Sequence, residues 1–397
     1  MRSSDSAGVM RILMVHNYYQ QRGGEDECTD QEVQLLRDRG HQVQLYARHN
    51  DEVKAWPLHR RAEMFMGTSW SARTVREIEN HVETFQPDVV HVQNFFPLIT
   101  PSVFHATRGV PTVSTLHNYR LMCPAGTYFR NGDVCEECRL NGLGSGIRHR
   151  CYRGSAVQTA AVALMLRRHR RMRTWDRQVS AWVALTPFAR DKFVEAGLPA
   201  DRILVRPNFL YHDIEPGGDE RSGAVFVGRL SEEKGLAFLL DAWRQLPDIQ
   251  LRIIGEGPQR AALETIIERK GLTNVHLAGR MPLEDVLEQL RCAACLVMPS
   301  RWYETFGRTI IEAYAAGTPV VAPRHGAMAD LVDHGKTGWL YDYDDTAGLV
   351  ESVQSILRDP VAAREVGRRA REVFEEQYSR DAGYESLVAV YRHVAGV

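Results

Sequence analysis

The sequence predicts an α/β protein built from two doubly wound domains, each a parallel sheet covered by helices. Short apolar, β-branched runs alternate with longer amphipathic stretches along the chain, which is the pattern of βαβ units. The length of 397 residues is large for one hydrophobic core and sufficient for two. One stretch without periodicity divides the alternation into two halves.

The first half contains five predicted strands, most of them followed by a helical stretch. They cover residues 10–16, 41–47, 87–93, 110–117 and 181–186. We assign residues 10–206 to the first domain, after a disordered leader at 1–9. Within it we expect a cysteine-rich insert at 118–152 and a basic helix at 155–177.

The second half begins after a segment rich in Pro, Gly and charge, which we interpret as a linker at 207–222. Six strands follow, at residues 223–229, 249–255, 274–280, 294–300, 319–323 and 338–343. The second domain spans 223–375, and 376–397 forms a final helix. Because such sheets bind ligands at the carboxyl ends of their strands, the two domains would share a central cleft.

Bulk composition excludes several classes of protein. Hydrophobic residues make up 44% and charged residues 25%, as in an ordinary globular protein. The formal net charge of -1 gives no global attraction to nucleic acid, so we expect no nucleic-acid partner. We find no apolar run of about 18 residues that would span a bilayer and no apolar signal-peptide core. The expected compartment is the cytoplasm.

Two glutamates, Glu304 and Glu312, are the first candidate site residues. Glu304 follows an apolar strand and lies near the start of a helix predicted at Phe306–Ala316. Free N–H groups at such a start favour an anion, whereas carboxylates accept hydrogen bonds from hydroxyls. On a helix, Glu312 would lie roughly 12 Å further along the axis. Phosphates on N–H groups and hydroxyls on carboxylates together suit a sugar nucleotide; two solvated glutamates are the alternative.

Three further turns lie after predicted strands. Arg229 and Lys234 flank the first turn of the second domain, where cations could hold a diphosphate. The glycines around Glu256 would permit close backbone approach to a ligand. In the first domain, Gly23-Gly24 follows the first strand, but neither the full GxGxxG nor the P-loop spacing is present.

Taken in order, these motifs resemble those of the family 4 retaining glycosyltransferases of GT-B fold. The shared motifs are Gly23-Gly24-x-Asp26, Gly228-Arg229-Leu230 with Lys234-Gly235, Gly255-Glu256-Gly257, and Glu304-x7-Glu312. The resemblance covers most of the chain, from about Arg11 to the final helix. It implies two Rossmann-like domains facing a cleft, with the C-terminal helix crossing back to the first domain.

The resemblance also implies roles for single residues. Glu304 would bind hydroxyls of the transferred sugar and Glu312 those of the ribose, while Arg229 and Lys234 would stabilise the leaving diphosphate. His117 would face the donor sugar and the acceptor. The implied catalytic set is Glu304, His117, Arg229 and Lys234. The implied donor-binding set is Gly23, Gly24, Arg229, Lys234, Glu256, Arg280, Met281, Glu304, Thr305, Phe306, Gly307 and Glu312.

The reaction implied is retaining, metal-independent hexosyl transfer from a nucleotide sugar, UDP- or GDP-linked, to an acceptor hydroxyl. The acceptor would be a glycan or a lipid-linked molecule, in polysaccharide, glycolipid or other glycoconjugate synthesis. The alternatives are a sugar-nucleotide epimerase or phosphorylase of the same fold, and a non-catalytic sugar-nucleotide-binding protein. No cofactor is expected for catalysis.

Four of the seven cysteines lie in the insert: Cys123, Cys135, Cys138 and Cys151. Their spacing, C-x11-C-x2-C-x12-C, would suit a closed tetrahedral zinc site that stabilises the loop after His117. Free thiols, an iron–sulfur cluster and disulfides are the other interpretations.

A strongly basic segment follows the insert. Ten arginines and one acid lie between Arg139 and Arg177, a local formal charge of +9. An apolar run ahead of Arg167–Arg173 suits a helix lying on an anionic membrane, here the inner face of the plasma membrane. The alternative is a solvated helix facing an acidic soluble acceptor or partner.

Overall fold

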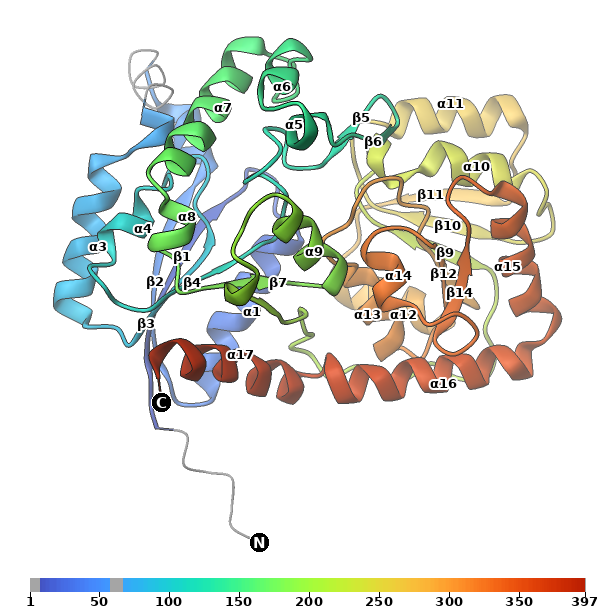
Figure 1. Ribbon diagram of the computed structural model, residues 1–397. Helices are drawn as coiled ribbons and strands as arrows, with labels where there is room; N and C mark the ends of the chain where they lie inside the picture. The colour runs from blue at the N-terminus through green and yellow to red at the C-terminus, as the bar shows by residue number, and fades with distance from the viewer. Residues whose placement is uncertain (1–7, 58–66, 397) are drawn as a thin grey trace, which may run out of the picture.

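The structure is a computed structural model that describes residues 8–57 and 67–396. The chain forms two α/β domains side by side, each built on a six-stranded parallel sheet (Figure 1). The first sheet has the strand order β2-β1-β3-β4-β7-β8 and the second has the order β11-β10-β9-β12-β13-β14. In each sheet the order reverses direction beside the first strand, so each has a switch point at which ligands bind.

The first domain follows the predicted alternation closely. Its sheet strands are β1 (Arg11–Tyr18), β2 (Gln42–His49), β3 (Val89–Asn94), β4 (Thr112–Thr115), β7 (Ala181–Ala184) and β8 (Ile203–Val205). Its helices are α1 (Gly24–Asp38), α3 (Ala72–Phe85), α4 (Val103–Ala106), α7 (Ala156–Arg171), α8 (Thr174–Arg177) and α9 (Pro187–Glu195). Short 3-10 turns lie at Asn50–Ala55, Gly67–Ser69 and Ala200–Arg202.

The insert between β4 and α7 is a small subdomain of its own. It holds the two-stranded antiparallel pair β5 (Phe129–Arg130) and β6 (Asp133–Val134), followed by α5 (Glu137–Leu140) and α6 (Gly144–Arg148). The β5–β6 turn reaches the second domain, where Arg301 donates from Nε to the Gly132 carbonyl at 2.9 Å. The insert therefore bridges the two domains above the cleft.

The second domain repeats the same architecture. Its strands are β9 (Ala224–Val227), β10 (Leu251–Ile254), β11 (Val275–Gly279), β12 (Cys295–Val297), β13 (Val320–Pro323) and β14 (Gly338–Tyr341). Its helices are α10 (Leu236–Trp243), α11 (Arg260–Lys270), α12 (Leu283–Cys292), α13 (Arg308–Ala315), α14 (Ala327–Leu331) and α15 (Thr346–Arg358). A 3-10 turn at Glu232–Lys234 precedes α10.

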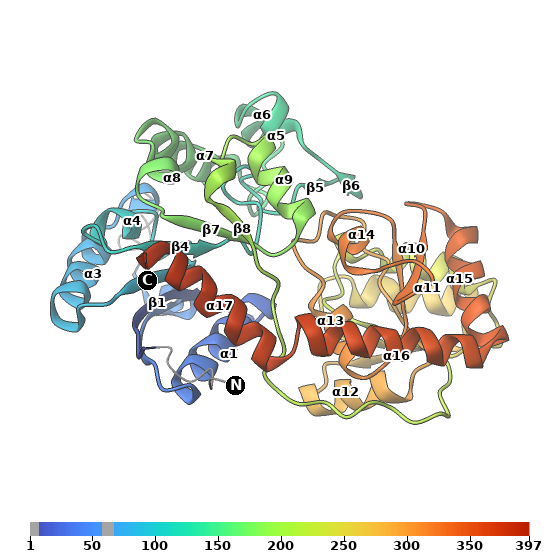
Figure 2. The ribbon, with the colours of Figure 1, turned by 60° about the horizontal axis from the view of Figure 1, so that its bottom comes forward.

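The last two helices connect the domains. Helix α16 (Pro360–Gln377) runs along the second domain and α17 (Arg380–Ala395) lies across the first (Figure 2). The apolar face of α17, including Leu387 and Tyr391, is buried against Ile12 and Met14 of β1. The C-terminal helix thus crosses back to the first domain, as the resemblance implies.

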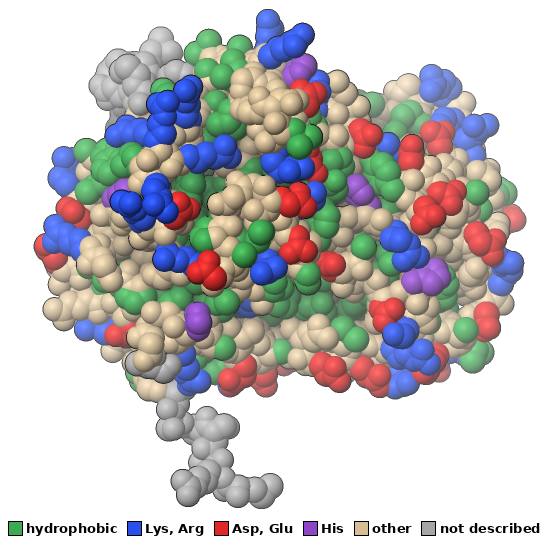
Figure 3. Space-filling view, viewed as in Figure 1, with side chains coloured by type: hydrophobic (Ala, Val, Ile, Leu, Met, Phe, Trp, Pro, Cys, Tyr) green, Lys and Arg blue, Asp and Glu red, His purple; other side chains and the backbone are tan. Residues whose placement is uncertain are grey.

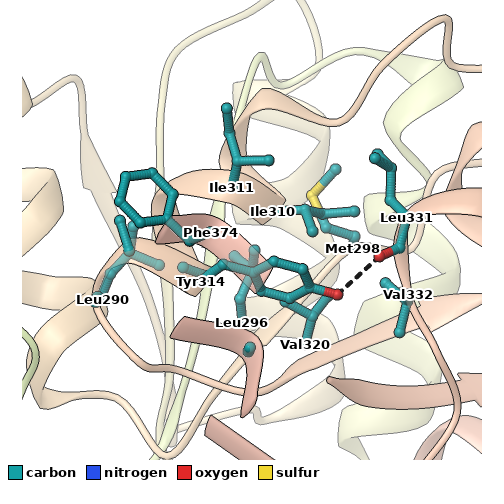
Figure 4. Close-up of a cluster of buried hydrophobic side chains, with 14 of the residues drawn as sticks. Leu290, Leu296, Met298, Ile310, Ile311, Tyr314, Val320, Leu331, Val332 and Phe374 are labelled. Carbon is teal, nitrogen blue, oxygen red and sulfur yellow. Dashed lines mark hydrogen bonds between the residues drawn. The ribbon is translucent and has the colours of Figure 1, made fainter. Parts of the chain in front are cut away.

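Helix α13 is anchored in the larger core of the second domain. Ile310, Ile311 and Tyr314 pack among Leu290, Leu296 and Phe374 (Figure 4). The Tyr314 hydroxyl donates to the Leu331 carbonyl at 2.9 Å. Full burial of such side chains contributes about 1.5–3 kcal/mol each, so the position of α13 is firmly fixed.

Several sequence-based boundaries differ from the structure. Strand β8 was not predicted. Its alternation is too short to stand out, and it forms because it completes the edge beside β7. The predicted basic helix at 155–177 is two helices, because the backbone of Arg173 is left-handed, with φ 53, and ends the run. Of the predicted leader, residues 1–7 lie outside the described residues.

Candidate functional site

Most of the predicted site residues lie where the carboxyl ends of the two sheets face each other. In the second domain these are the turns after β9, β10, β11 and β12, which carry Arg229, Glu256, Arg280 and Glu304. In the first domain they are the turn after β1 and the loop after β4, which carry Gly23-Gly24 and His117. Thr305 and Glu304 contact His117 and Tyr119 of the first domain, so these two groups of turns meet at the boundary between the domains.

Glu304 is a buried carboxylate held by two donors. Its Oε1 accepts from Lys234 Nζ at 2.5 Å and from the Ser300 hydroxyl at 2.8 Å. No described residue hydrogen-bonds to Oε2. Across the cleft, Tyr119 donates to the Glu304 backbone carbonyl at 3.4 Å. Lys234 thus positions the carboxylate, and the second oxygen stays available to a ligand hydroxyl.

The predicted helix at Phe306–Ala316 was wrong at its start. Helix α13 begins at Arg308 with Gly307 as its N-cap, so Glu304 lies in the preceding loop and the distance estimated along a helix axis does not apply. A contact to the first domain holds this loop, because the Thr305 hydroxyl donates to the His117 carbonyl at 2.8 Å. Phe306 packs into the core and lies 6.2 Å from the Tyr378 ring, centroid to centroid, so its side chain supports the loop.

Glu312 lies within α13 and is paired inside its own helix. Arg308 donates from Nε to Glu312 Oε1 at 3.1 Å, and from Nη1 to the Cys28 sulfur of the first domain at 3.3 Å. Burial raises the pKa of the Glu312 carboxyl, and the Arg308 guanidinium opposes that shift. Arg308 Nη2 is buried without a hydrogen-bond partner among the described residues. Sequence analysis missed Arg308, although its i,i+4 spacing to Glu312 indicated a pair.

The remaining donor-side residues surround this centre. Arg229 and Arg280 are exposed, and no described residue forms a hydrogen bond or ion pair with the Arg229 side chain. Glu256 pairs with Arg260 at 2.7 Å on the surface, so its side chain faces its own helix. Met281 packs partly against the core beside α13.

The glycines on either side of Glu256 have a structural role that differs from the expected one. A Cβ at Gly255 would lie 1.8 Å from the Gly228 carbonyl oxygen, and one at Gly257 would lie 2.3 Å from that of Leu230. These glycines therefore let the turns after β9 and β10 pack together, which holds Arg229 in place.

The Gly23-Gly24 turn leaves open space at the start of α1. A Cβ on Gly23 would meet no atom within 4 Å, and one on Gly24 would meet only Arg308 Cδ, at 4.0 Å. The first residue of α1 thus lies beside the first residue of α13. The first N–H groups of both helices lack partners within their helices, so two helix N-termini face one space, which favours an anion. Asp26 is buried below them, 2.8 Å from His16 Nε2.

Sequence analysis also missed Glu25. Its Oε2 accepts from the Tyr19 hydroxyl at 3.1 Å and from Asn118 at 3.5 Å, whereas Oε1 is buried without a partner among the described residues. Burial raises the pKa of this carboxyl to about 8, which the Tyr19 hydrogen bond opposes and the nearby Asp26 charge reinforces. Beside a space that favours an anion, such a group is better tolerated as a neutral acid.

His117 lies at the mouth of a small cavity in the first domain. The cavity is also lined by Gln93, Asn118 and Arg120. His117 Nε2 lies 2.7 Å from Gln93 Oε1, and burial lowers the pKa of the imidazole to about 3. His117 is therefore neutral at physiological pH.

The four cysteines of the insert are free thiols. Burial, followed by the charge of Cys123, raises the pKa of Cys138 to about 12. Across residues 8–57 and 67–396, no three His, Cys, Asp or Glu side chains are grouped closely enough to hold a metal ion. A zinc site in the insert stays a prediction from the cysteine spacing.

Comparison with known proteins identifies the family. The family model for glycosyl transferases group 1 matches residues 212–373, and the family model for Glycosyltransferase Family 4 matches residues 22–213. Alpha-D-kanosaminyltransferase of Streptomyces kanamyceticus is 30% identical over 310 residues, covering 76% of this chain and 74% of the relative. Alpha-maltose-1-phosphate synthase of Mycolicibacterium smegmatis is 32% identical over 263 residues, covering 55% and 67%.

Solved structures agree on the fold. HepE of Anabaena, in complex with UDP and glucose, aligns with a TM-score of 0.67 at 18% identity over 98% of both chains. Sucrose-phosphate synthase of Thermosynechococcus elongatus aligns with a TM-score of 0.73 at 20% identity over 98% of this chain and 99% of that one. Together with the matched relatives, the two facing sheets and the returning C-terminal helix, these alignments show that the chain belongs to the family 4, group 1 glycosyltransferases and has the GT-B fold.

Proposed function

We propose that this glycosyltransferase moves a hexosyl group from a UDP- or GDP-linked donor to an acceptor hydroxyl with retention of anomeric configuration and without a catalytic metal. The observation that supports the proposal most directly is that Gly24 and Arg308, the first residues of α1 and α13, lie beside each other while Lys234 binds Glu304 in the loop before α13. These groups would hold a diphosphate, and the free oxygen of Glu304 would accept from a sugar hydroxyl.

In the proposed reaction, the bond between the anomeric carbon and the diphosphate oxygen breaks first. Lys234, Arg229 and the helix N-termini stabilise the charge that develops on the leaving diphosphate. The acceptor oxygen then forms its bond on the face that the diphosphate leaves, and the acceptor proton passes to a departing phosphate oxygen. No side chain forms a covalent bond to the sugar.

The decisive experiment is a product analysis with UDP-glucose and GDP-mannose as donors and a panel of glycan and lipid-linked acceptors. We expect nucleoside diphosphate release coupled to a new glycosidic bond, whose configuration by proton NMR matches that of the donor. An inverted product would reject the retaining mechanism. Epimerised donor, or turnover that requires inorganic phosphate, would instead identify one of the alternative activities.

The acceptor side of the proposal includes an anionic membrane. Lys and Arg side chains gather over the first domain where α6 and α7 lie (Figure 3). On α7 and just beyond it, Arg167, Arg168, Arg171 and Arg173 are exposed, next to the exposed apolar side chains of Leu164 and Met172. A surface of this kind attracts acidic headgroups and inserts apolar tips between them. No helix in the described ranges is long and apolar enough to cross a membrane.

Flotation with vesicles tests this surface. We expect the protein to float with vesicles containing phosphatidylglycerol and not with pure phosphatidylcholine. Replacing Arg167, Arg168 and Arg171 by Glu should abolish flotation. A matched triple change on the opposite domain, of Arg358, Arg368 and Arg369 to Glu, should leave it intact. Equal flotation of the two variants would contradict the proposed surface.

A further inference from the structure

A buried chain of polar side chains runs from the start of the linker to the edge of the cleft. Arg206 forms an ion pair with Glu32 of α1. Glu32 Oε2 accepts from Gln93 Nε2 of β3 at 2.5 Å, and Gln93 Oε1 lies 2.7 Å from His117 Nε2. Arg206, Glu32 and Gln93 are 1%, 2% and 4% exposed, so water does not compete for these bonds.

The donor and acceptor of each hydrogen bond between these side chains can be assigned in only one way. A guanidinium can only donate, and a carboxylate in an ion pair can only accept. The Gln93 amide must therefore turn its NH2 group to Glu32 and its oxygen to His117. Since that oxygen can only accept, His117 Nε2 must carry the proton, and this fixes the tautomer that sequence and ring position leave undetermined.

The other ring nitrogen of His117 then has a free lone pair. No described residue hydrogen-bonds to Nδ1, and the ring lines the cavity beside Asn118 and Arg120. The backbone carbonyl of the same residue accepts from Thr305, which follows Glu304. Nδ1 is thus an open acceptor on a residue whose backbone contacts the neighbour of Glu304.

His91 provides a contrast within the same network. Its Nδ1 lies 2.8 Å from the Tyr391 hydroxyl and its Nε2 lies 2.8 Å from that of Thr115. With both nitrogens occupied and the side chain fully buried, His91 can offer nothing to a ligand. Only one histidine of the pair keeps an open acceptor.

We propose that Gln93, Glu32 and Arg206 are positioning residues that hold His117 as its Nε2–H tautomer, so that Nδ1 accepts a hydrogen bond from a hydroxyl of the bound sugar. The tautomer itself follows from the protein alone, whereas its use by a sugar hydroxyl rests on the proposed function. A ligand that presents a hydroxyl to Nδ1 is favoured over one that presents a carbonyl or a phosphate oxygen there.

The network also includes both chain segments that cross between the domains. Arg206 begins the segment leading to the second domain, and its Nη2 and Nε reach the Gly383 carbonyl and the Ser386 hydroxyl of α17, each at 3.4 Å. The orientation of the His117 ring is therefore tied to the packing of the domain connections as well as to the cleft.

Nitrogen NMR of protein labelled with 15N-histidine tests the tautomer directly. We expect long-range proton–nitrogen spectra to show His117 with a protonated Nε2 and an unprotonated Nδ1 from pH 6 to 8, assigned by loss of the peaks in H117Q. Protonated Nδ1, or a ring that titrates in this range, would overturn the proposal. Because this measurement needs only the unmodified protein, misfolding of a variant cannot obscure it.

Gln93→Met tests the positioning role with a side chain of similar length that cannot accept from Nε2. We expect mixed tautomers at His117 and at least a fivefold rise in KM for UDP-glucose. Gln31→Met is the control, because it replaces a buried amide on α1 that does not bond to His117. It should change neither the tautomer nor KM. Unchanged tautomer and KM in Gln93→Met would overturn the role of Gln93.

Adding UDP-glucose to the labelled protein separates the two levels of the argument. We expect the Nδ1 resonance to move in the direction that accepting a hydrogen bond produces. Binding without such a shift would overturn the sugar contact and leave the proposed function intact. Absence of binding by both UDP-glucose and GDP-mannose would reject the proposed donor and, with it, the sugar contact.

Discussion

At the scale of single residues, the site depends on a carboxylate whose two oxygens are used differently. Lys234 and Ser300 occupy one oxygen of Glu304, and no described residue bonds to the other, which we propose for the ligand. Removing the side chain would eliminate the ligand contact and leave the Lys234 charge unpaired, whereas an amide would keep the size and part of the hydrogen bonding.

We therefore expect Glu304→Ala to lower kcat for transfer by about 10²–10³-fold. The kcat of Glu304→Gln should lie between that of the parent protein and that of Glu304→Ala. The measurement is nucleoside diphosphate release with circular dichroism as the check of folding. Glu264→Ala, which removes an exposed partner of Arg260 on α11, is the matched control and should retain full activity. Full activity in Glu304→Ala would exclude the assigned role.

Gly24 makes a prediction that separates folding from binding. Its Cβ would enter open space, so Gly24→Ala should fold normally and could gain up to about 1 kcal/mol from helix propensity. The same methyl group would occupy the space in which we place the diphosphate. We expect roughly tenfold weaker UDP-glucose binding by calorimetry; unchanged affinity would place the diphosphate elsewhere.

Glu25 makes a prediction about pH. Its carboxyl has an ordinary pKa of 4.5 when the chain is unfolded and a pKa of about 8 in the fold, so the folded state binds the proton more tightly. Its contribution to stability is therefore full below about pH 4.5 and is lost as the pH rises towards 8.

Glu25→Gln removes this titration. We expect the free energy of unfolding of the variant to match that of the parent protein at pH 5. At pH 9 it should exceed that of the parent by on the order of 1 kcal/mol, because water near the carboxyl relaxes part of the pKa shift. Thermal unfolding at both pH values measures the difference. Asp30→Asn, which removes a carboxylate on the same helix that accepts from Tyr18, controls for the loss of an acid from α1.

At the scale of elements, α13 connects the site to the back of the second domain. Its start carries Arg308 and faces the cleft. At its other end, Arg221 donates to the Ala316 carbonyl at 2.8 Å and Arg371 of α16 donates to the carbonyl of Ala315. Cations at a helix C-terminus satisfy carbonyls that lack helical partners and complement the helix dipole.

Arg371→Ala should therefore destabilise the protein by about 1–3 kcal/mol. Arg364 offers the matched control on the same helix, because its side chain is exposed and has no hydrogen bond or ion pair among the described residues. Arg364→Ala should change stability by less than about 0.5 kcal/mol. Equal unfolding midpoints for the two variants would show that the contacts of Arg371 contribute nothing.

The insert is the element for which spacing and structure disagree. From the cysteine spacing we expect about one zinc ion per chain. In the structure the four cysteines are free thiols, and no three His, Cys, Asp or Glu side chains of the described residues lie close enough to hold a metal ion. Metal analysis and thiol titration of the same sample separate these outcomes. One zinc with no reactive thiol among the four would mean that the insert closes further than the structure shows.

At the scale of the whole molecule, the sequence predicted what depends on local periodicity. The two sheets and most strands followed from alternation alone, because strands such as β3, β4, β7 and β13 are buried along their whole length and therefore read as apolar runs. Motif order then placed Glu304, Lys234 and Arg229 at one edge of a sheet.

What the sequence could not provide were contacts between distant segments. The start of α13 depends on Thr305 reaching the first domain, so no local rule placed it at Arg308. Likewise, Glu25, Gln93 and Glu32 gain their roles from partners on other elements. Their side chains would be unremarkable polar residues in any single-sequence pattern.

The returning helix makes a prediction at this scale. Ending the chain after Gln377 would expose the β1 face that α17 covers and leave the Arg206 contacts to α17 unmade. We expect the truncated protein to be largely insoluble. Its solubility should return when residues 378–397 are fused to it again. Soluble, active truncated protein would show that α17 is dispensable.

The same helix sets an order of events during synthesis. Ile12 and Met14 leave the ribosome long before Leu387 and Tyr391, which cover them. The second domain can bury its own core while the chain is still growing. The first domain, although made earlier, cannot complete its core until α17 has left the ribosome, so the two domains become stable together only after α17 has been made.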